Sequence, residues 1–319
     1  MIYFFKKLQK KAYLKIFLFI SCCFYSQLVF ANLQPLLKSN HQQNIANNYN
    51  QKPLIATANP AIYQIMQAIA LNSQQLILIN GGSNSEHNQK FNKSDLEKLS
   101  QVKMFYYIDD KIDYNLSKLV KNFPDLMVFK VADLAAIKII EGDSHLWLNP
   151  ENAIIIASDI AKQLISLDSN NKSYYQNRSI NFKKQTIKNI DFINNLFTRK
   201  ESSKNKNYQH SYLFYHNGYS YFEKYFHLNP VMSMLYDDDK EISIADLKKF
   251  NSLIKQNKIR CIFGDAHSEK SSAKKLAENN NIKFLQIELW KNQNRDHLNQ
   301  EGYNDSIRKL AIAINDCIE

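Results

Sequence analysis

The sequence predicts an α/β protein of two lobes, each a parallel sheet covered by helices, joined by one long linking helix. Short apolar runs alternate with amphipathic segments over the first half of the chain and again over the last third. Between them, residues 171–199 contain no glycine or proline and carry apolar residues at helical spacing. Alternating strands and helices are typical of βαβ units and therefore of parallel sheets. An uninterrupted helical period predicts one long helix.

The first lobe is expected over residues 32–170. Its predicted strands are the apolar runs 53–58, 76–80, 104–109 and 126–131. Asn59, which precedes a proline, predicts a helix start, because asparagine is a favourable N-cap and proline fits the first helical turn. Asn149 is also followed by proline and predicts a second start. The run Ser94–Glu97 fits a capping box and predicts that another helix begins there.

The second lobe is expected over residues 200–319 and repeats the alternation of strands and helices. Its predicted strands are residues 211–216, 259–265 and 282–289. Its predicted helices are residues 219–226, 243–257 and 268–280 and a terminal helix that ends near Cys317. The alternation predicts a second parallel sheet.

Residues 1–31 have the pattern of an export signal. A lysine-rich start is followed by an apolar run that closes at Ala31, and Val29 two residues earlier completes a cleavage pattern. The apolar run is short for a membrane-spanning helix, although an uncleaved anchor is the alternative. Cys22 and Cys23 could accept a lipid, but the residues before them match a lipoprotein signal poorly. We therefore expect a periplasmic protein that is cleaved after Ala31.

The charge of the chain does not favour nucleic-acid binding. Cleavage would remove 31 of the 319 residues, five of them lysines and none acidic, so that 288 residues with a formal charge of +6 instead of +11 remain. The remaining basic residues are spread along the chain and form no dense cluster with interleaved aromatic residues. A chain of this length is sufficient for two domains with their own cores.

Two cysteines remain after the leader, Cys261 and Cys317. An even number of cysteines in an oxidising compartment predicts a disulfide. It would join the strand at residues 259–265 to the C-terminal helix. Two buried free thiols are the alternative.

Four side chains are candidates for a metal site. His87, His145, His216 and Asp265 lie at the ends of predicted strands or in loops that follow them, and ligands of open α/β sheets bind beyond these carboxyl ends. Imidazole nitrogen and carboxylate oxygen are ligands that Zn²⁺ accepts. The four are tens of residues apart, so spacing alone does not separate a metal ligand from an ordinary loop histidine. Leu146–Leu148, next to His145, are expected to pack in the core.

Several segments resemble one protein family. They are a first strand and helix at residues 53–70 and four ligand segments at residues 81–95, 143–153, 215–226 and 261–277. The second ligand segment contains the motif HxWLxP, with His145 as its histidine. In these segments the chain resembles the zinc-receptor proteins of bacterial zinc ABC importers, the ZnuA type of metal-binding solute-binding protein. The resemblance extends over nearly the whole mature chain.

The resemblance implies the two-lobed fold of a metal receptor that holds Zn²⁺ through His87, His145, His216 and Asp265. It implies a membrane permease and a cytoplasmic ATPase as partners. We expect a monomer that is not an enzyme and binds no nucleic acid. Some zinc receptors also have a disulfide where Cys261 and Cys317 lie.

The chain departs from the family pattern in two ligand segments. Lys93 stands where the family usually has a proline before Ser-Asp, so the loop that carries His87 is less standard than the others. Asp265 lies in Gly-Asp-Ala-His instead of the more frequent Glu-Pro-Gln. The identity of the fourth ligand therefore stays open between Asp265, Glu86 and water.

The expected function is that of a periplasmic, high-affinity zinc receptor. Manganese receptors of the superfamily typically have an acid at the third ligand position, and the imidazole of His216 there favours zinc. A manganese or iron receptor of the same superfamily is the alternative. A secreted zinc-dependent hydrolase with Glu86 as general base is another, although no hydrolase motif accompanies that residue. An adhesin is a third alternative function.

Overall fold

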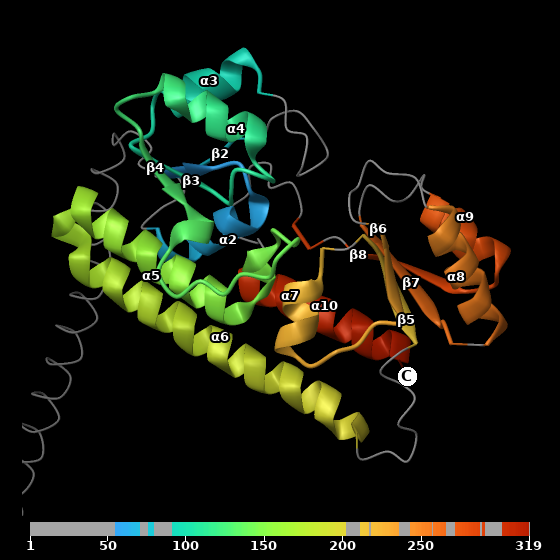
Figure 1. Ribbon diagram of the computed structural model, residues 1–319. Coiled ribbons are helices and arrows are strands. Elements are labelled where there is room, and N and C mark those ends of the chain that lie inside the picture. Colours follow the sequence, from blue (N-terminus) through green and yellow to red (C-terminus); the bar gives the residue numbers. More distant parts are fainter. Residues whose placement is uncertain are drawn as a thin grey trace, which may run out of the picture. The chain divides into compact units, whose positions relative to one another are not determined.

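In the part of the chain that the structure describes, two four-stranded parallel sheets form the framework (Figure 1). The computed structural model describes residues 55–70, 76–79, 91–201, 211–216, 218–235, 243–256, 258–265, 272–287, 289–290 and 302–318. Every pairing between named strands is parallel, and helices accompany both sheets. The predicted α/β class with parallel sheets is confirmed.

The N-terminal sheet has the strand order β2-β1-β3-β4. Its strands are β1 (Ile55–Thr57), β2 (Leu76–Leu78), β3 (Met104–Tyr107) and β4 (Met127–Lys130), each within its predicted run. Because β2 lies on one side of β1 and β3 on the other, the connections change direction between β1 and β3. Open α/β sheets bind ligands beyond the carboxyl ends of their strands at such a switch point.

Helices α2 (Pro60–Ile69) and α5 (Pro150–Leu167) begin where the sequence predicted. Asn59 Oδ1 accepts hydrogen bonds from the N–H groups of the second and third residues of α2, at 2.9 and 3.1 Å. Asn149 caps α5 in the same way. Each asparagine satisfies N–H groups for which a helix start provides no intrahelical partner.

Helix α3 (Lys93–Leu99) is capped two residues earlier than the sequence predicted, so the capping box expected at Ser94 is wrong. Asn92 is the N-cap. Its Oδ1 accepts from the Asp95 N–H at 3.0 Å, and Asp95 Oδ2 accepts from the Asn92 N–H at 3.0 Å. The side chain of Asp95 is buried against the helix start, whereas that of Glu97 is exposed. The shorter carboxylate therefore closes the reciprocal pair.

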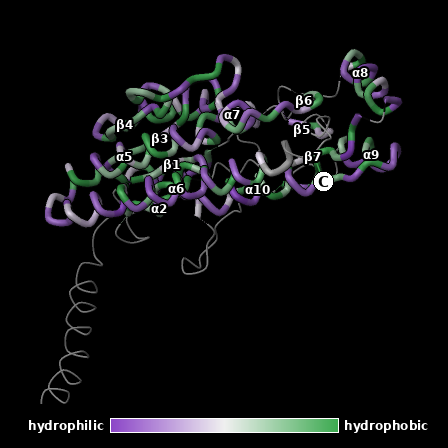
Figure 2. Tube along the Cα trace, turned by 90° about the horizontal axis from the view of Figure 1, so that it is seen from below, coloured by the Kyte–Doolittle hydropathy of each residue, from purple (hydrophilic) through white to green (hydrophobic). Residues whose placement is uncertain are grey.

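Helix α6 (Lys172–Glu201) is the single long helix that the sequence predicted. It packs against α2, α5 and α10 (Tyr303–Ile318), and hydrophilic and hydrophobic positions alternate along it (Figure 2). Tyr175, Phe182 and Ile193 are buried. These side chains join α6 to helices from both halves of the sequence.

The C-terminal sheet has the equivalent order, β6-β5-β7-β8. Its strands are β5 (Tyr212–His216), β6 (Met232–Leu235), β7 (Cys261–Asp265) and β8 (Lys283–Ile287). The sequence analysis missed β6 and the short helix α4 (Tyr114–Leu119) of the N-terminal half. Helices α7 (Ser220–Tyr225), α8 (Ile244–Lys255) and α9 (Ser272–Asn279) lie at their predicted places. The switch point of this sheet falls between β5 and β7.

Successive residues of the central strands pack on opposite faces of each sheet. Tyr106 and Phe214 belong to one large cluster of buried apolar side chains that also includes Leu310 of α10. Their neighbours Phe105 and Leu213 belong to two smaller clusters on the other faces. Burial on both faces is typical of parallel sheets. The large cluster contains residues of both sheets, so α10 and the core connect the two halves.

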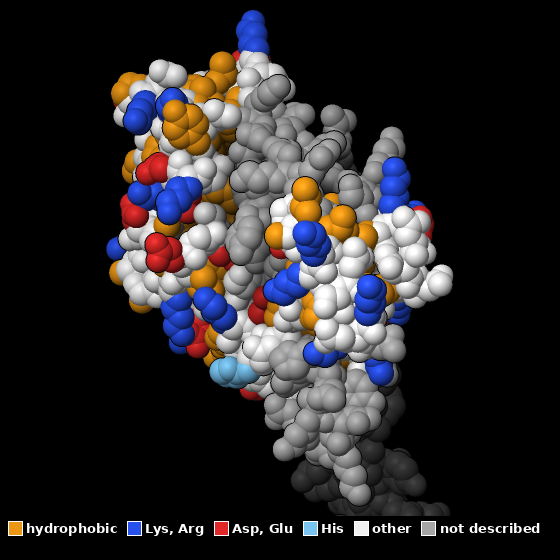
Figure 3. Space-filling view, turned by 45° about the vertical axis from the view of Figure 1, so that its right-hand side comes forward, with side chains coloured by type: hydrophobic (Ala, Val, Ile, Leu, Met, Phe, Trp, Pro, Cys, Tyr) orange, Lys and Arg blue, Asp and Glu red, His pale blue; other side chains and the backbone are white. Residues whose placement is uncertain are grey.

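One face of the described surface is mixed in charge. On the face shown in Figure 3, Lys and Arg side chains are interspersed with acidic, apolar and uncharged ones. Within the described ranges no helix has the length and apolar composition to cross a membrane. The predicted leader, residues 1–31, lies outside those ranges.

Cys261 of β7 and Cys317 of α10 form a disulfide, with their Cα atoms 5.9 Å apart. This is the pairing that the cysteine count predicted. Both residues are buried in the large apolar cluster. The bond therefore fixes the terminal helix to a central strand of the C-terminal sheet.

Replacement of both Cys261 and Cys317 by serine is expected to lower the free energy of unfolding by about 4 kcal/mol, because the bond closes a loop between residues 56 apart in sequence. Urea unfolding followed by circular dichroism measures the loss. The reduced wild-type protein should unfold at the same urea concentration as the double variant. Equal midpoints for the oxidised protein and the variant would contradict this account.

Candidate metal centre

Two of the candidate residues end adjacent strands of the C-terminal sheet. His216 is the last residue of β5, and Asp265 is the last residue of β7. The strands are paired in parallel with Phe214 opposite Phe263, so His216 and Asp265 both lie two residues beyond that pair. Their backbones therefore occupy equivalent positions at the switch point, where this fold class binds ligands.

His145 lies at the start of the short 3₁₀ helix η4 (Leu146–Leu148). The three residues of η4 are buried, as the sequence predicted for them. The side-chain amide of Asn152 donates to the carbonyl oxygens of Leu146 and Lys138, at 3.0 and 2.9 Å. Tyr303 Oη of α10 donates to the carbonyl oxygen of Trp147 at 2.7 Å. The backbone that carries His145 is thus fixed to the core.

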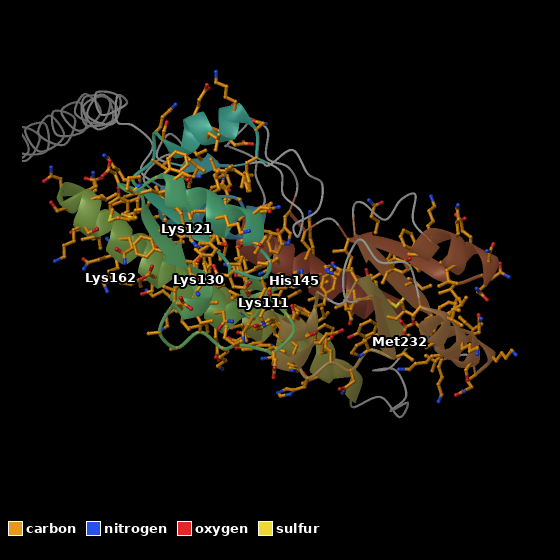
Figure 4. The ribbon with its side chains drawn as sticks, turned by 45° about the horizontal axis from the view of Figure 1, so that its top comes forward. Lys111, Lys121, Lys130, His145, Lys162 and Met232 are labelled. Atoms are coloured by element: carbon orange, nitrogen blue, oxygen red, sulfur yellow. A yellow bond between two sulfur atoms is a disulfide. The ribbon has the colours of Figure 1, made fainter. Side chains whose placement is uncertain are left out.

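The segment before His145 is bonded to both halves of the protein. Ser144 Oγ donates to Asp109 Oδ2 at 2.9 Å, and Asp109 follows β3 at the switch point of the N-terminal sheet. The N–H of Ile140 donates to Tyr221 Oη of α7 at 2.8 Å. Figure 4 shows His145 where the N-terminal elements meet the C-terminal ones. These bonds bring the segment next to the helix that follows His216.

The imidazoles of His145 and His216 lie together. Their ring centroids are 5.0 Å apart, and their planes are inclined at 74°. A Cβ atom added to Gly218 would lie 2.9 Å from His216 Cε1 and 3.0 Å from both Cε1 and Nε2 of His145. Contacts this short are not tolerated without displacement, so the missing side chain of Gly218 is what lets both rings approach one point. His145 is both buried and close to a second imidazole.

Asp143 is hydrogen-bonded to Nδ1 of the His145 ring. Its Oδ1 lies 2.7 Å from His145 Nδ1 and accepts from the His145 N–H at 2.9 Å. Burial alone would raise the pKa of the Asp143 carboxyl, but hydrogen bonds from His145 and Ser220 outweigh it and lower that pKa. Asp143 is therefore a carboxylate at neutral pH. The sequence analysis did not single it out, although an acid two residues before a candidate ligand was a usable signal.

Glu223 of α7 is a second buried acid that the sequence analysis missed. Burial, and then the negative charge of Asp143, raise the pKa of the Glu223 carboxyl to about 8. The acid is therefore mostly protonated at pH 7. It adds little negative charge to a region that already contains the carboxylate of Asp143.

The remaining candidates are only partly covered by the structure. His87 and Glu86 lie outside the described residues, and Asp265 is described by its backbone alone. Among the side chains that are described, no three of the histidine, cysteine and acidic type gather as a complete metal site would require. The structure thus brings together His145 and His216. The other expected ligands stay predictions.

Paired imidazoles suit a borderline transition metal. Zn²⁺ binds imidazole nitrogen at about 2.0–2.1 Å, and it usually completes a tetrahedral set with further nitrogen, sulfur or oxygen ligands. The pair of rings is compatible with such an ion, because the ring centroids are 5.0 Å apart and the Cε1–Nε2 edge of His145 lies close to the His216 ring beside Gly218.

The sequence is similar to those of known metal-uptake proteins. The sequence model of the ZnuA family, described as zinc-uptake complex component A periplasmic, matches residues 55–317. The chain is 25% identical over 179 residues to the high-affinity zinc uptake system protein ZnuA of Brucella abortus (56% of this chain, 51% of that protein). It is 25% identical over 248 residues to the manganese ABC transporter substrate-binding lipoprotein PsaA of Streptococcus pneumoniae (73% of this chain, 78% of that protein).

The fold also matches a solved structure. The crystal structure of the AdcAII protein of Streptococcus pneumoniae superposes with a TM-score of 0.67 at 18% identity, covering 82% of this chain and 97% of that one. The two-lobed fold that the sequence predicted is thereby confirmed. Because the family model extends over most of its length, the chain belongs to the ZnuA family.

Proposed function

We propose that the protein is a periplasmic receptor that binds zinc with high affinity and delivers it to the membrane permease and ATPase of an ABC importer. A ZnuA-family chain is a metal-binding, substrate-binding protein of such a transporter, a receptor and not an enzyme. The observation that carries the choice of cargo is the convergence of His145 and His216 on the point beside Gly218.

The proposed ligands are His87, His145, His216 and Asp265, with Glu86 or water as the alternative fourth ligand. The backbone of Asp265 ends β7 beside the end of β5, which supports a carboxylate close to His216. His87 follows β2 in the sequence, and its position in the structure lies outside the described residues.

Zinc is favoured over manganese by the ligand type. Both metals occur in the names of relatives, since the Brucella abortus protein is a zinc uptake protein and the Streptococcus pneumoniae PsaA a manganese one. Imidazole is a ligand for zinc, whereas manganese favours carboxylate, carbonyl and water oxygens. The two described imidazoles therefore support a zinc site.

Export completes the proposal. We propose that residues 1–31 are a signal peptide cleaved after Ala31 and that the mature protein is a monomer. The periplasmic family description supports a location outside the cytoplasm. The disulfide between Cys261 and Cys317 also suits an oxidising compartment.

Substitution of either His145 or His216 by alanine is expected to remove high-affinity zinc binding. The loss should exceed the roughly 10- to 100-fold typical of losing a hydrogen-bond partner of a ligand, because a ligand itself is lost. Competition with a fluorescent zinc chelator measures the affinity. The same titration with Mn²⁺ should give weaker binding by the wild-type protein.

The matched control is His227→Asn, since His227 is an exposed histidine with a φ of 55°, a conformation that asparagine tolerates. Its zinc affinity should equal that of the wild type. Wild-type affinity in the His145→Ala or His216→Ala protein would remove that residue from the site.

Gly218→Ala is expected to weaken zinc binding by about tenfold or more. Overpacking costs about 1–3 kcal/mol, and relief of the 2.9 and 3.0 Å contacts requires the two rings to move apart. Gly302→Ala is the control, because among the described atoms an added Cβ there would meet Asp305 Oδ2 alone, at 3.8 Å. Unchanged affinity in the Gly218→Ala protein, with the rings in place, would contradict the proposed position of the metal.

Zinc affinity is expected to fall as the pH is lowered from about 7.5 to about 5. A ligating imidazole must be neutral, and an ordinary imidazole protonates near pH 6.5, so protons compete with the metal. Zinc titrations at a series of pH values measure this dependence. A flat profile would argue against a histidine site.

A further inference from the structure

We propose that Asp143 is a positioning residue that fixes the proton of His145 on Nδ1 and so makes Nε2 the nitrogen that faces the metal. This inference rests on the proposed function and extends it to a side chain that touches the ligand but not the cargo. It also assigns which of the two ring nitrogens of His145 binds.

The hydrogen bonding determines the tautomer. Asp143 Oδ1 lies 2.7 Å from His145 Nδ1, and a carboxylate has lone pairs but no proton to donate. Nδ1 must therefore carry the proton in this contact, which leaves the lone pair of the neutral ring on Nε2. Metal-binding histidines commonly donate their second ring nitrogen to a carboxylate in this way.

The opposite edge of the ring faces the second imidazole. The Nε2 atom of His145 would lie 3.0 Å from a Cβ atom at Gly218, and Cε1 of His216 would lie 2.9 Å from the same atom. The nitrogen that Asp143 leaves with a lone pair is thus the one directed to the point where the rings converge. The orientation of the His145 ring and the position of its proton therefore both favour Nε2 as the metal-binding nitrogen.

A tight turn holds the carboxylate in place. The Asp143 N–H donates to the Ile140 carbonyl oxygen at 3.2 Å, and these two residues form an isolated antiparallel bridge. Gly142 has a φ of 82°, which favours glycine. The N–H of Ile140 donates to Tyr221 Oη at 2.8 Å. Because both ends of the turn are bonded, the Asp143 carboxylate reaches the ring with little freedom to move.

The first test reads the tautomer in the metal-free protein. Side-chain ¹⁵N NMR of purified, histidine-labelled protein, with His145 assigned from the His145→Ala spectrum, should show the Nδ1–H form of His145 in the wild type. Asp143→Ala should populate the Nε2–H form. Asp133→Ala is the matched control, because it removes an exposed aspartate that is paired with Lys130 and has no part in the site, and it should keep the wild-type tautomer.

The second test measures zinc affinity of the same proteins. Asp143→Ala should bind zinc about 10- to 100-fold more weakly, and Asp133→Ala should stay within about threefold of the wild type. If Asp143→Ala fails to fold, Asp143→Leu, which has a similar shape and no acceptor atom, replaces it. With no acceptor left for the proton on Nδ1, it should also shift His145 toward the Nε2–H form and weaken binding.

Two results would overturn the proposal: a wild-type tautomer of His145 after loss of the Asp143 carboxylate, or a changed tautomer with unchanged zinc affinity. A wild-type protein that binds no zinc would instead contradict the proposed function. In that case a tautomer shift in Asp143→Ala would still support the control of the His145 ring by Asp143.

Discussion

The close approach of two imidazoles at a glycine is the constraint on which the rest of the site depends. His145 and His216 come from opposite halves of the chain, yet their ring centroids are 5.0 Å apart. Gly218 allows this because any Cβ atom there would collide with both rings. The core fixes the positions of both rings, because the buried helix η4 follows His145 and the central strand β5 ends at His216. The hydrogen bonds of Ile140 to Tyr221 and of Tyr303 to Trp147 join the two halves of the chain next to these rings.

The charges around the two imidazole rings favour the binding of a cation. Asp143 places one ionised carboxylate against His145, and burial keeps most of Glu223 in its neutral form near pH 7. Neutral imidazoles beside the carboxylate of Asp143 can accept a divalent ion. The charge that the metal brings would be partly offset by Asp143 through the imidazole, and the carboxylate would remain hydrogen-bonded throughout.

Local signals made the framework predictable from sequence, whereas the site depends on contacts across the fold. Asn59 and Asn149 act on N–H groups two or three residues away, and the pattern of α6 repeats every turn. The start of α3 was misplaced because Asn92 and Ser94 are both good caps and tertiary burial of Asp95 decides between them. No spacing rule joins His145 to His216. Their pairing was expected only from strand ends and from the family resemblance, and the roles of Gly218, Asp143 and Glu223 appear only once the rings are placed.

The central claim is that His145 and His216 bind one metal ion. A crystal structure of the zinc-loaded protein, with anomalous data on both sides of the zinc absorption edge, tests it most directly. The account predicts a single strong zinc peak about 2.0–2.1 Å from a ring nitrogen of each histidine, with Nε2 as the nitrogen of His145. A zinc peak that contacts only one of these rings, or that lies elsewhere on the protein, would contradict it.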